Sequence, residues 1–250
     1  MAEWKFPLGL ASLLLALAEV MQRTGVLPSV MPAPSQVLMQ LWSNFPLVMN
    51  NCAATLGTAA AGYVAALLVT VVASAVAVMW HRLYGAVYHF GLTLQAIPVI
   101  AAAPLLAILI GGGSPLRMLI TALACQFPML VGLMQGLCAA DSQQRELLHV
   151  LAASRADSWR YLLFPAALPM VFAGLKIAAP SAILGAITAE WAGADRGVGA
   201  IMLNALFSFD VVKVWLSVLL TCILAAGAYG FWAFLESRFL RWSIPTENHW

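Results

Sequence analysis

The sequence predicts an all-α polytopic membrane protein with about six transmembrane helices. Of the 250 residues, 63% are hydrophobic and only 9% are charged, whereas an ordinary soluble domain has about 25% charged residues. The mean hydropathy is +0.92, and a soluble fold of this length could not cover so much apolar surface. Lipid must therefore solvate much of the chain.

Six apolar segments reach or approach the roughly 20 residues that a helix needs to cross the hydrocarbon core. The second is long enough to cross with tilt, and Pro98 and Pro104 interrupt the third. The six segments are residues 7–22, 53–80, 86–110, 115–138, 170–191 and 211–235.

The first segment has a second interpretation. Lys5, an apolar run over residues 8–15 and the triplet Ala16-Leu17-Ala18 together resemble a secretory signal peptide with its cleavage site. Glu3 offsets the charge of Lys5 and weakens this resemblance. We expect a retained helix, with cleavage as the alternative.

Lysine and arginine in the loops set the orientation, because they accumulate on the cytoplasmic side. With six spans and a cytoplasmic N-terminus, eight basic residues fall inside and four outside, so both termini are expected in the cytoplasm. The inner set is Lys5, Arg82, Arg145, Arg155, Arg160, Lys176, Arg238 and Arg241, and the outer set is Arg23, Arg117, Arg196 and Lys213.

The chain shows no convincing internal repeat and no low-complexity linker. We therefore expect one membrane domain over residues 51–240. An N-terminal transmembrane helix and periplasmic segment (residues 1–50) precede it, and a cytoplasmic tail (residues 241–250) follows it. In the second span, two series of small residues favour close helix–helix packing: Gly57, Ala61 and Ala65, and Ala54, Thr58 and Gly62.

The sequence contains no recognisable arrangement of catalytic or metal-binding residues. The glycines of "GGGSPLR" (residues 111–117) lack the Lys-Ser/Thr ending of a phosphate loop, and they favour a turn. The four histidines are scattered without ligand spacing, and the four cysteines are expected to be mostly buried free thiols. The sequence predicts neither a metal site nor a cofactor, and no catalysis by this chain.

A few polar residues in the apolar segments are candidates for a translocation path. Each has an alternative role in helix–helix contacts. Glu190, at the end of the fifth segment, is either an anchor at the membrane interface or a residue of the path, because a carboxylate at mid-bilayer is costly and usually functional. The candidates are Gln95, Pro98, Gln126, Thr188 and Glu190.

The sequence pattern over residues 142–165 predicts a helix–turn–helix on the cytoplasmic face. Residues 142–151 can form a first short helix, and Ala152-Ala153 a turn. Ser154-Arg155-Ala156-Asp157 fits a capping box with Asp in place of Glu, so a second helix is expected to run to about Phe164, where Pro165 stops it. The alternative is an ordinary loop.

This region resembles the EAA loop of the inner-membrane permeases of ABC importers that work with a separate binding protein. The stretch is "ELLHVLAASRADSWRYLLFPAALPMVFAGLKIA". Glu146 takes the Glu position of the family pattern, Ala152 stands where Gly is expected, and Pro165 and Pro169 fall at its proline positions.

Three further segments resemble the nitrate, sulfonate and taurine branch of this family, in the family's order. They are "MPAPSQVLMQLW" (residues 31–42), "PVIAAAPLLAILIGGG" (98–113) and "GAITAEWAGADRGVGAIMLNA" (185–205). The resemblance extends over nearly the whole chain.

The resemblance implies the type I importer permease fold. It also implies a permease homodimer in the bacterial inner membrane, two cytoplasmic ATPase subunits that hydrolyse ATP, and a periplasmic binding protein; no nucleic acid is implicated. The residues implied for ATPase coupling are Glu146, Ala152, Ala153, Ser154, Arg155, Asp157, Pro165 and Pro169.

Three positions depart from the family pattern. Leu147 and Leu148 replace two alanines, and Ala152 replaces a glycine. If that position requires left-handed backbone geometry, alanine costs about 1 kcal/mol there.

The cargo stays open. Sulfonate, taurine and nitrate compete with pyrimidine precursors of thiamine and riboflavin-like solutes. A secondary transporter and a membrane-embedded enzyme are the alternatives to an importer. The first would carry paired charges and repeat symmetry, and the second a catalytic or metal cluster at depth.

Overall fold

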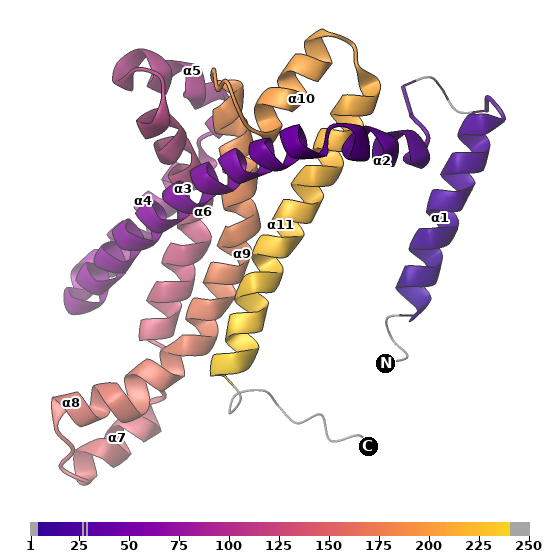
Figure 1. Cartoon of the computed structure of the whole chain (residues 1–250). Helices are drawn as coiled ribbons and strands as arrows, with labels where there is room; N and C mark the ends of the chain where they lie inside the picture. The colour runs from indigo at the N-terminus through magenta and orange to yellow at the C-terminus, as the bar shows by residue number, and fades with distance from the viewer. Residues whose placement is uncertain (1–4, 27, 29, 241–250) are drawn as a thin grey trace.

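Every regular element that the structure describes is helical. The structure, a computed structural model, describes residues 5–26, 28 and 30–240, so the predicted tail at residues 241–250 lies outside the described residues. The elements, shown in Figure 1, are α1 (Lys5–Arg23), α2 (Pro34–Ser43), α3 (Phe45–Met79), α4 (His81–Ala96), α5 (Val99–Ile110), α6 (Ser114–Leu137), α7 (Ser142–Val150), α8 (Arg155–Ser158), the π-helical turn η1 (Trp159–Leu163), α9 (Phe164–Trp191), α10 (Val198–Phe207) and α11 (Val211–Phe239).

Four helices among the described residues are long and apolar enough to cross a membrane. They are α3, α6, α11 and the continuous helix Ala156–Trp191, which contains α9. The pair α4 and α5, bent by 94° at its break, makes a fifth if it is one span. The predicted number of about six is reached only when α1, a helix of 19 residues, is counted with them.

The break between α4 and α5 falls at Ile97 and Pro98, as the sequence predicts. Proline lacks the backbone N–H that would continue the hydrogen-bond ladder, and its ring disfavours helical geometry at the preceding residue. The predicted interruption at Pro104 is wrong, because α5 runs through this residue from Val99 to Ile110.

The helices α6 and α9 form the centre of the bundle. A Cβ atom on Gly132 would lie 2.7 Å from the carbonyl oxygen of Met170, and one on Gly174 would lie 2.6 Å from that of Pro128. One turn further, a Cβ on Gly136 would lie 2.8 Å from the carbonyl oxygen of Ala167. Small residues thus allow the two backbones to touch, as is typical of helix pairs in lipid.

Polar contacts tie the neighbouring helices to α9. The hydroxyl of Tyr63 in α3 donates to the carbonyl oxygen of Leu175 over 3.0 Å, and its ring stacks on Trp232 of α11. Lys176 of α9 and Glu236 of α11 form an ion pair whose side chains are mostly shielded from water. α3, α9 and α11 are thereby joined within the membrane segment.

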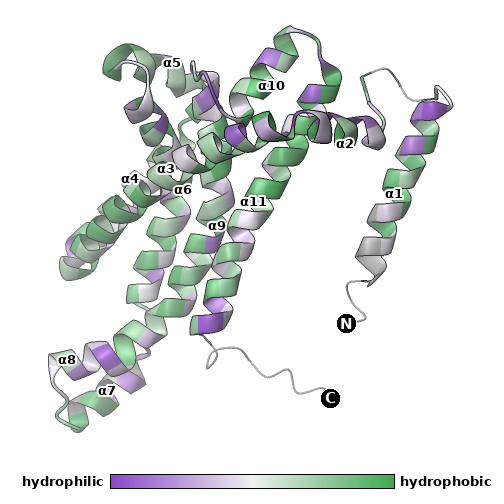
Figure 2. Cartoon of the chain, viewed as in Figure 1, coloured by the Kyte–Doolittle hydropathy of each residue, from purple (hydrophilic) through white to green (hydrophobic). Residues whose placement is uncertain are grey.

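The molecule has two distinct ends. At one end, α7 and α8 form a hairpin beyond α6 and α9, on the same side as the end of α11; α5 and α10 lie at the opposite end (Figure 1). Hydrophilic residues lie on the hairpin and at the opposite end of the bundle, whereas the long helices are mainly hydrophobic (Figure 2). The short helices α2 and α10 were not predicted.

Candidate functional site

The hairpin between α6 and α9 turns at Ala152, which adopts a left-handed backbone conformation with φ 50°. The N–H of Ala153 donates to the carbonyl oxygen of Leu148 over 3.0 Å. This six-to-one bond defines a Schellman ending of α7, whose left-handed position is usually glycine. Ala152 therefore has the left-handed geometry on which the expected cost of alanine depends, at the position where the family pattern has glycine.

The second arm of the hairpin begins with the predicted capping box. The N–H of Asp157 donates to Oγ of Ser154 over 3.1 Å, and the N–H of Ser154 donates to Oδ2 of Asp157 over 3.3 Å. The Ser154 hydroxyl also donates to the same carboxylate oxygen over 2.6 Å. Because the shorter Asp side chain still reaches back, it replaces the usual Glu.

The predicted stop at Pro165 is wrong. The chain runs from α8 through η1 into α9 without a break, and Ala156–Trp191 is one helix of 36 residues. In η1 the N–H of Phe164 bonds to the carbonyl oxygen of Trp159, five residues back. This π-helical turn shifts the ladder, so that Pro165 occupies the first turn of α9, where no N–H is required. Pro169 lies inside α9.

Four of the eight predicted coupling residues are exposed on the hairpin. Glu146, Ala152, Ser154 and Asp157 are exposed, and Ala153 is half-buried. The side chain of Arg155 lies outside the described set. Pro165 and Pro169 are partly buried at the start of α9.

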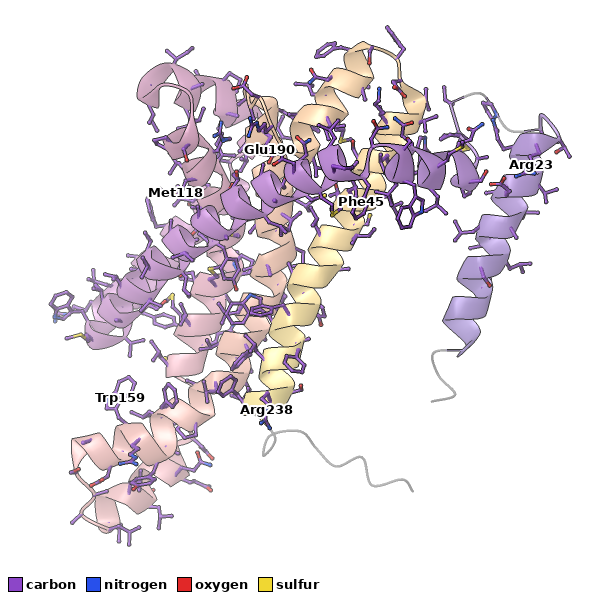
Figure 3. The ribbon with its side chains drawn as sticks, in the orientation of Figure 1. Arg23, Phe45, Met118, Trp159, Glu190 and Arg238 are labelled. Atoms are coloured by element: carbon purple, nitrogen blue, oxygen red, sulfur yellow. The ribbon has the colours of Figure 1, made fainter. Side chains whose placement is uncertain are left out.

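Large apolar side chains share this surface. Val150 is 78% exposed and Leu151 is 65% exposed. Leu147, one of the departures from the family pattern, and Trp159 are also exposed, and Figure 3 shows Trp159 at this end of the molecule. Several large apolar side chains exposed beside polar groups are typical of a protein interaction site.

Three of the predicted path residues line one cavity. Gln95 at the end of α4, Pro98 at the break and Thr188 of α9 surround a space of about 370 Å³. Ser181, two turns before Thr188 on α9, lines it as well, and sequence reasoning missed it. A serine inside an apolar segment gives no signal by itself, because its hydroxyl can bond within its own helix, as Ser181 does with Ile177.

The other two predicted path residues lie elsewhere. The side-chain amide of Gln126 is buried and donates to the carbonyl oxygen of Gly91 over 3.3 Å, a contact between α6 and α4. Glu190 is 1% exposed and faces the start of α10. Neither lines the cavity at the α4–α5 break.

The described residues contain no group of three His, Cys, Asp or Glu side chains that could hold a metal ion. All four cysteines are free: Cys52 and Cys125 are buried, whereas Cys138 and Cys222 are exposed. The prediction of mostly buried thiols therefore holds for only two of them. Cys222 lies within the apolar α11, whose outer face needs no polar residue in lipid.

The fold and these sites define an all-helical polytopic membrane protein with a polar hairpin at one end and a cavity beside a broken helix. The chain belongs to the family of binding-protein-dependent transport system inner membrane components, whose model matches residues 66–241. It is therefore a permease subunit of a binding-protein-dependent ABC importer, a multi-pass inner-membrane protein that does not itself catalyse a reaction.

Several permeases are similar to this chain. The formylaminopyrimidine transport permease protein ThiX of Halalkalibacterium halodurans is 29% identical over 92% of each chain. The nitrate import permease protein NrtB of Synechocystis is 25% identical over 88% of this chain and 82% of its own. The putative aliphatic sulfonates transport permease protein SsuC of Bacillus subtilis is 26% identical over 62% of this chain and 56% of its own.

Because the chain belongs to this family, it is an importer subunit, and the two alternatives, a secondary transporter and a membrane-embedded enzyme, are set aside. A binding-protein-dependent importer implies an ATPase and a binding protein as partners.

Proposed function

We propose that the hairpin over residues 142–165 is the surface on which the ATPase subunits dock, and that it lies in the cytoplasm. The observation that carries this proposal is its construction. The small residues Ala152 and Ala153 form the tip, and the exposed apolar side chains of Val150 and Leu151 precede it. The second arm continues without a break into α9, and residues 138–141 join the first arm to α6. A partner bound there would act on the central helix pair.

The hairpin provides a short mechanical connection. Both arms end in helices whose backbones are in contact at Gly132, Gly136 and Gly174, so a displacement of the hairpin moves α6 and α9 together. Packed helices have discrete arrangements and transmit small shifts as rigid bodies. Closure of the ATPases on ATP would thus bias the path between outward-open and inward-open states. A homodimer of this chain would supply two such hairpins.

The docking surface is tested by Ala153→Glu. A bulky charge at the half-buried tip should abolish transport and ATPase co-purification while the protein remains in the membrane, because an unpaired charge in an interface is strongly unfavourable. Uptake in proteoliposomes containing binding protein, ATPase and permease gives the readout. Ser237→Glu, at an exposed position near the end of α11 on the same side of the molecule (Figure 1), adds the same charge outside the hairpin and should transport normally. Normal transport by Ala153→Glu would show that the tip is not the docking surface.

We propose a small polar solute as the cargo and rank an uncharged pyrimidine-like compound above sulfonate, taurine and nitrate. The side chains of Gln95, Ser181 and Thr188 offer neutral hydrogen-bonding groups, and the described lining of their cavity contains no charged residue. The extended similarity to a formylaminopyrimidine permease supports the same class.

Ligand screening of the binding protein, followed by uptake of the bound compounds, tests this ranking. A pyrimidine should bind and be transported. A binding protein that takes only sulfonates or nitrate would overturn the ranking, while leaving the importer function in place.

A further inference from the structure

The first turn of α10 is held by three side chains from two other helices. The N–H of Gly197 donates to Oδ1 of Asn51 over 2.8 Å, and that of Val198 donates to Oγ1 of Thr55 over 2.8 Å. The N–H of Gly199 donates to Oε2 of Glu190 over 2.7 Å. Three consecutive amide groups at the start of one helix are thus bound by side chains of α3 and α9.

The two glycines leave space for this arrangement and for nothing larger. Gly197 has φ 132°, a conformation that other residues rarely adopt, and a Cβ there would overlap the carboxylate of Glu190. A Cβ on Gly199 would lie 2.6 Å from the carbonyl oxygen of Ile187. The backbone of α10 therefore sits directly on the Glu190 side chain.

Burying the Glu190 carboxylate costs free energy, so an interaction of this side chain must offset that cost. Glu190 is 1% exposed, and within the described part of the chain its Oε1 has no hydrogen-bond partner. The N–H groups and the positive end of the α10 dipole offset part of the desolvation cost. An apolar residue would avoid that cost and would not bind the amides of α10.

The same turn of α9 has a second face, which lines cavities. Thr188 belongs to the cavity at the α4–α5 break. Thr188 and Trp191 also line a space of about 220 Å³ beside Met202 of α10. Figure 3 shows Glu190 at the end of the molecule opposite the hairpin. One helical turn thus faces the candidate path on one side and binds α10 on the other.

We propose that Glu190 is a positioning residue that fixes α10 to the path-lining turn of α9, with Thr55 and Asn51 fixing it to α3. α10 then moves with α9 when the outer end of the path opens, instead of separating from it. The role of α10 in transport rests on the proposed function. The attachment itself is a property of the permease alone.

Two substitutions of Glu190 distinguish a need for a hydrogen-bond acceptor from a need for a negative charge. In Glu190→Gln an amide oxygen can still accept from Gly199, so transport should stay within about twofold of wild type. Glu190→Leu has similar size and no acceptor, and its transport per ATP hydrolysed should fall about tenfold, as expected for the loss of a hydrogen bond to a charged group. ATPase activity stimulated by the binding protein should persist in both variants.

Thr55 supplies a milder pair of variants in case Glu190→Leu fails to insert. Thr55→Ser keeps the hydroxyl acceptor, whereas Thr55→Val keeps the shape and removes it. Hydrogen exchange of the full-length permease in nanodiscs, followed by mass spectrometry of a peptide containing residues 197–201, reports on the attachment. Protection of this peptide should fall about tenfold in Thr55→Val and Glu190→Leu, and should be retained in Thr55→Ser and Glu190→Gln.

Two results would overturn the proposal. Unchanged protection in Thr55→Val and Glu190→Leu would show that these side chains do not fix α10. Retained protection in Glu190→Gln with transport as low as in Glu190→Leu would show that the charge itself is needed. An inactive wild-type complex would count against the proposed function, whereas the exchange result would still decide whether Glu190 holds α10.

Discussion

At the scale of single residues, Ala152 carries backbone strain at the tip of the hairpin. Its left-handed conformation ends α7 and reverses the chain. For an L-residue other than glycine this conformation costs about 1–2 kcal/mol. Since the tip is also the proposed docking surface, its conformation determines which atoms a partner meets.

Replacing Ala152 by glycine should stabilise the hairpin by about 1 kcal/mol relative to the same change at Ala153. Both substitutions add similar freedom to the unfolded chain, but only Ala152 has positive φ, so the difference isolates the strain. Hydrogen exchange over residues 147–158 of the permease without ATPase is the measurement. Ala152→Gly should exchange more slowly than Ala153→Gly, and equal rates would mean that Ala152 is not strained.

Contacts between residues close in the sequence can be predicted from the sequence pattern, whereas contacts between distant residues cannot. Ser154 and Asp157 are three positions apart, so their mutual capping is local and could be predicted. The surroundings of Glu190 could not, because its neighbours Asn51 and Thr55 lie about 140 positions away in the chain. Only the folded bundle brings them to the start of α10.

At the scale of elements, the approach of α6 and α9 depends on glycine. Gly174→Ala would place a Cβ 2.6 Å from the carbonyl oxygen of Pro128 and 3.0 Å from Cα of Gly132. Because both neighbours are backbone atoms, the helices must separate, and we expect a loss of about 1–3 kcal/mol in the free energy of unfolding.

The matched control is Gly57→Ala in α3, where a Cβ meets no atom within 4 Å. This change should leave stability unaltered or slightly raised, since alanine favours the helix. Thermal unfolding in detergent compares the two variants. Equal melting temperatures for Gly174→Ala and wild type would contradict a direct backbone contact between α6 and α9.

Apolar length predicted the long helices well, because each must bury its backbone polar groups within itself in lipid. It also placed the break at Pro98. It missed α2 and α10, which have ten residues each and are too short to be distinguished from loops by hydropathy. It also predicted an end at Pro165, because a π-helical turn that accommodates the proline leaves no mark in the hydrophobic pattern.

At the scale of the whole molecule, the proposed ATPase surface and the proposed outer end of the path lie at opposite ends of the bundle. The second arm of the hairpin continues into α9, and residues 138–141 join the first arm to α6. The opposite end of α9 lines the cavities and binds α10. A single rigid helix pair therefore connects the proposed ATPase surface with the outer end of the path. This connection works only if the hairpin lies in the cytoplasm, where ATP is available.

Cys138 is a natural reporter of this orientation, because it is exposed at the end of α6 beside the hairpin. Cys52 and Cys125 are buried, and Cys222 is exposed only within the apolar α11, so a charged thiol reagent in water should react with Cys138. We expect labelling in inverted membrane vesicles and none in intact spheroplasts.

The opposite end needs its own reporter. Ser208→Cys, at the exposed turn between α10 and α11, combined with Cys138→Ser, should reverse the pattern and label in spheroplasts. Labelling of Cys138 from outside would place the hairpin away from the ATPases. In that case the exposed apolar residues Val150 and Leu151 would have to meet a periplasmic partner, and α6 and α9 could not transmit force from ATP hydrolysis to the path.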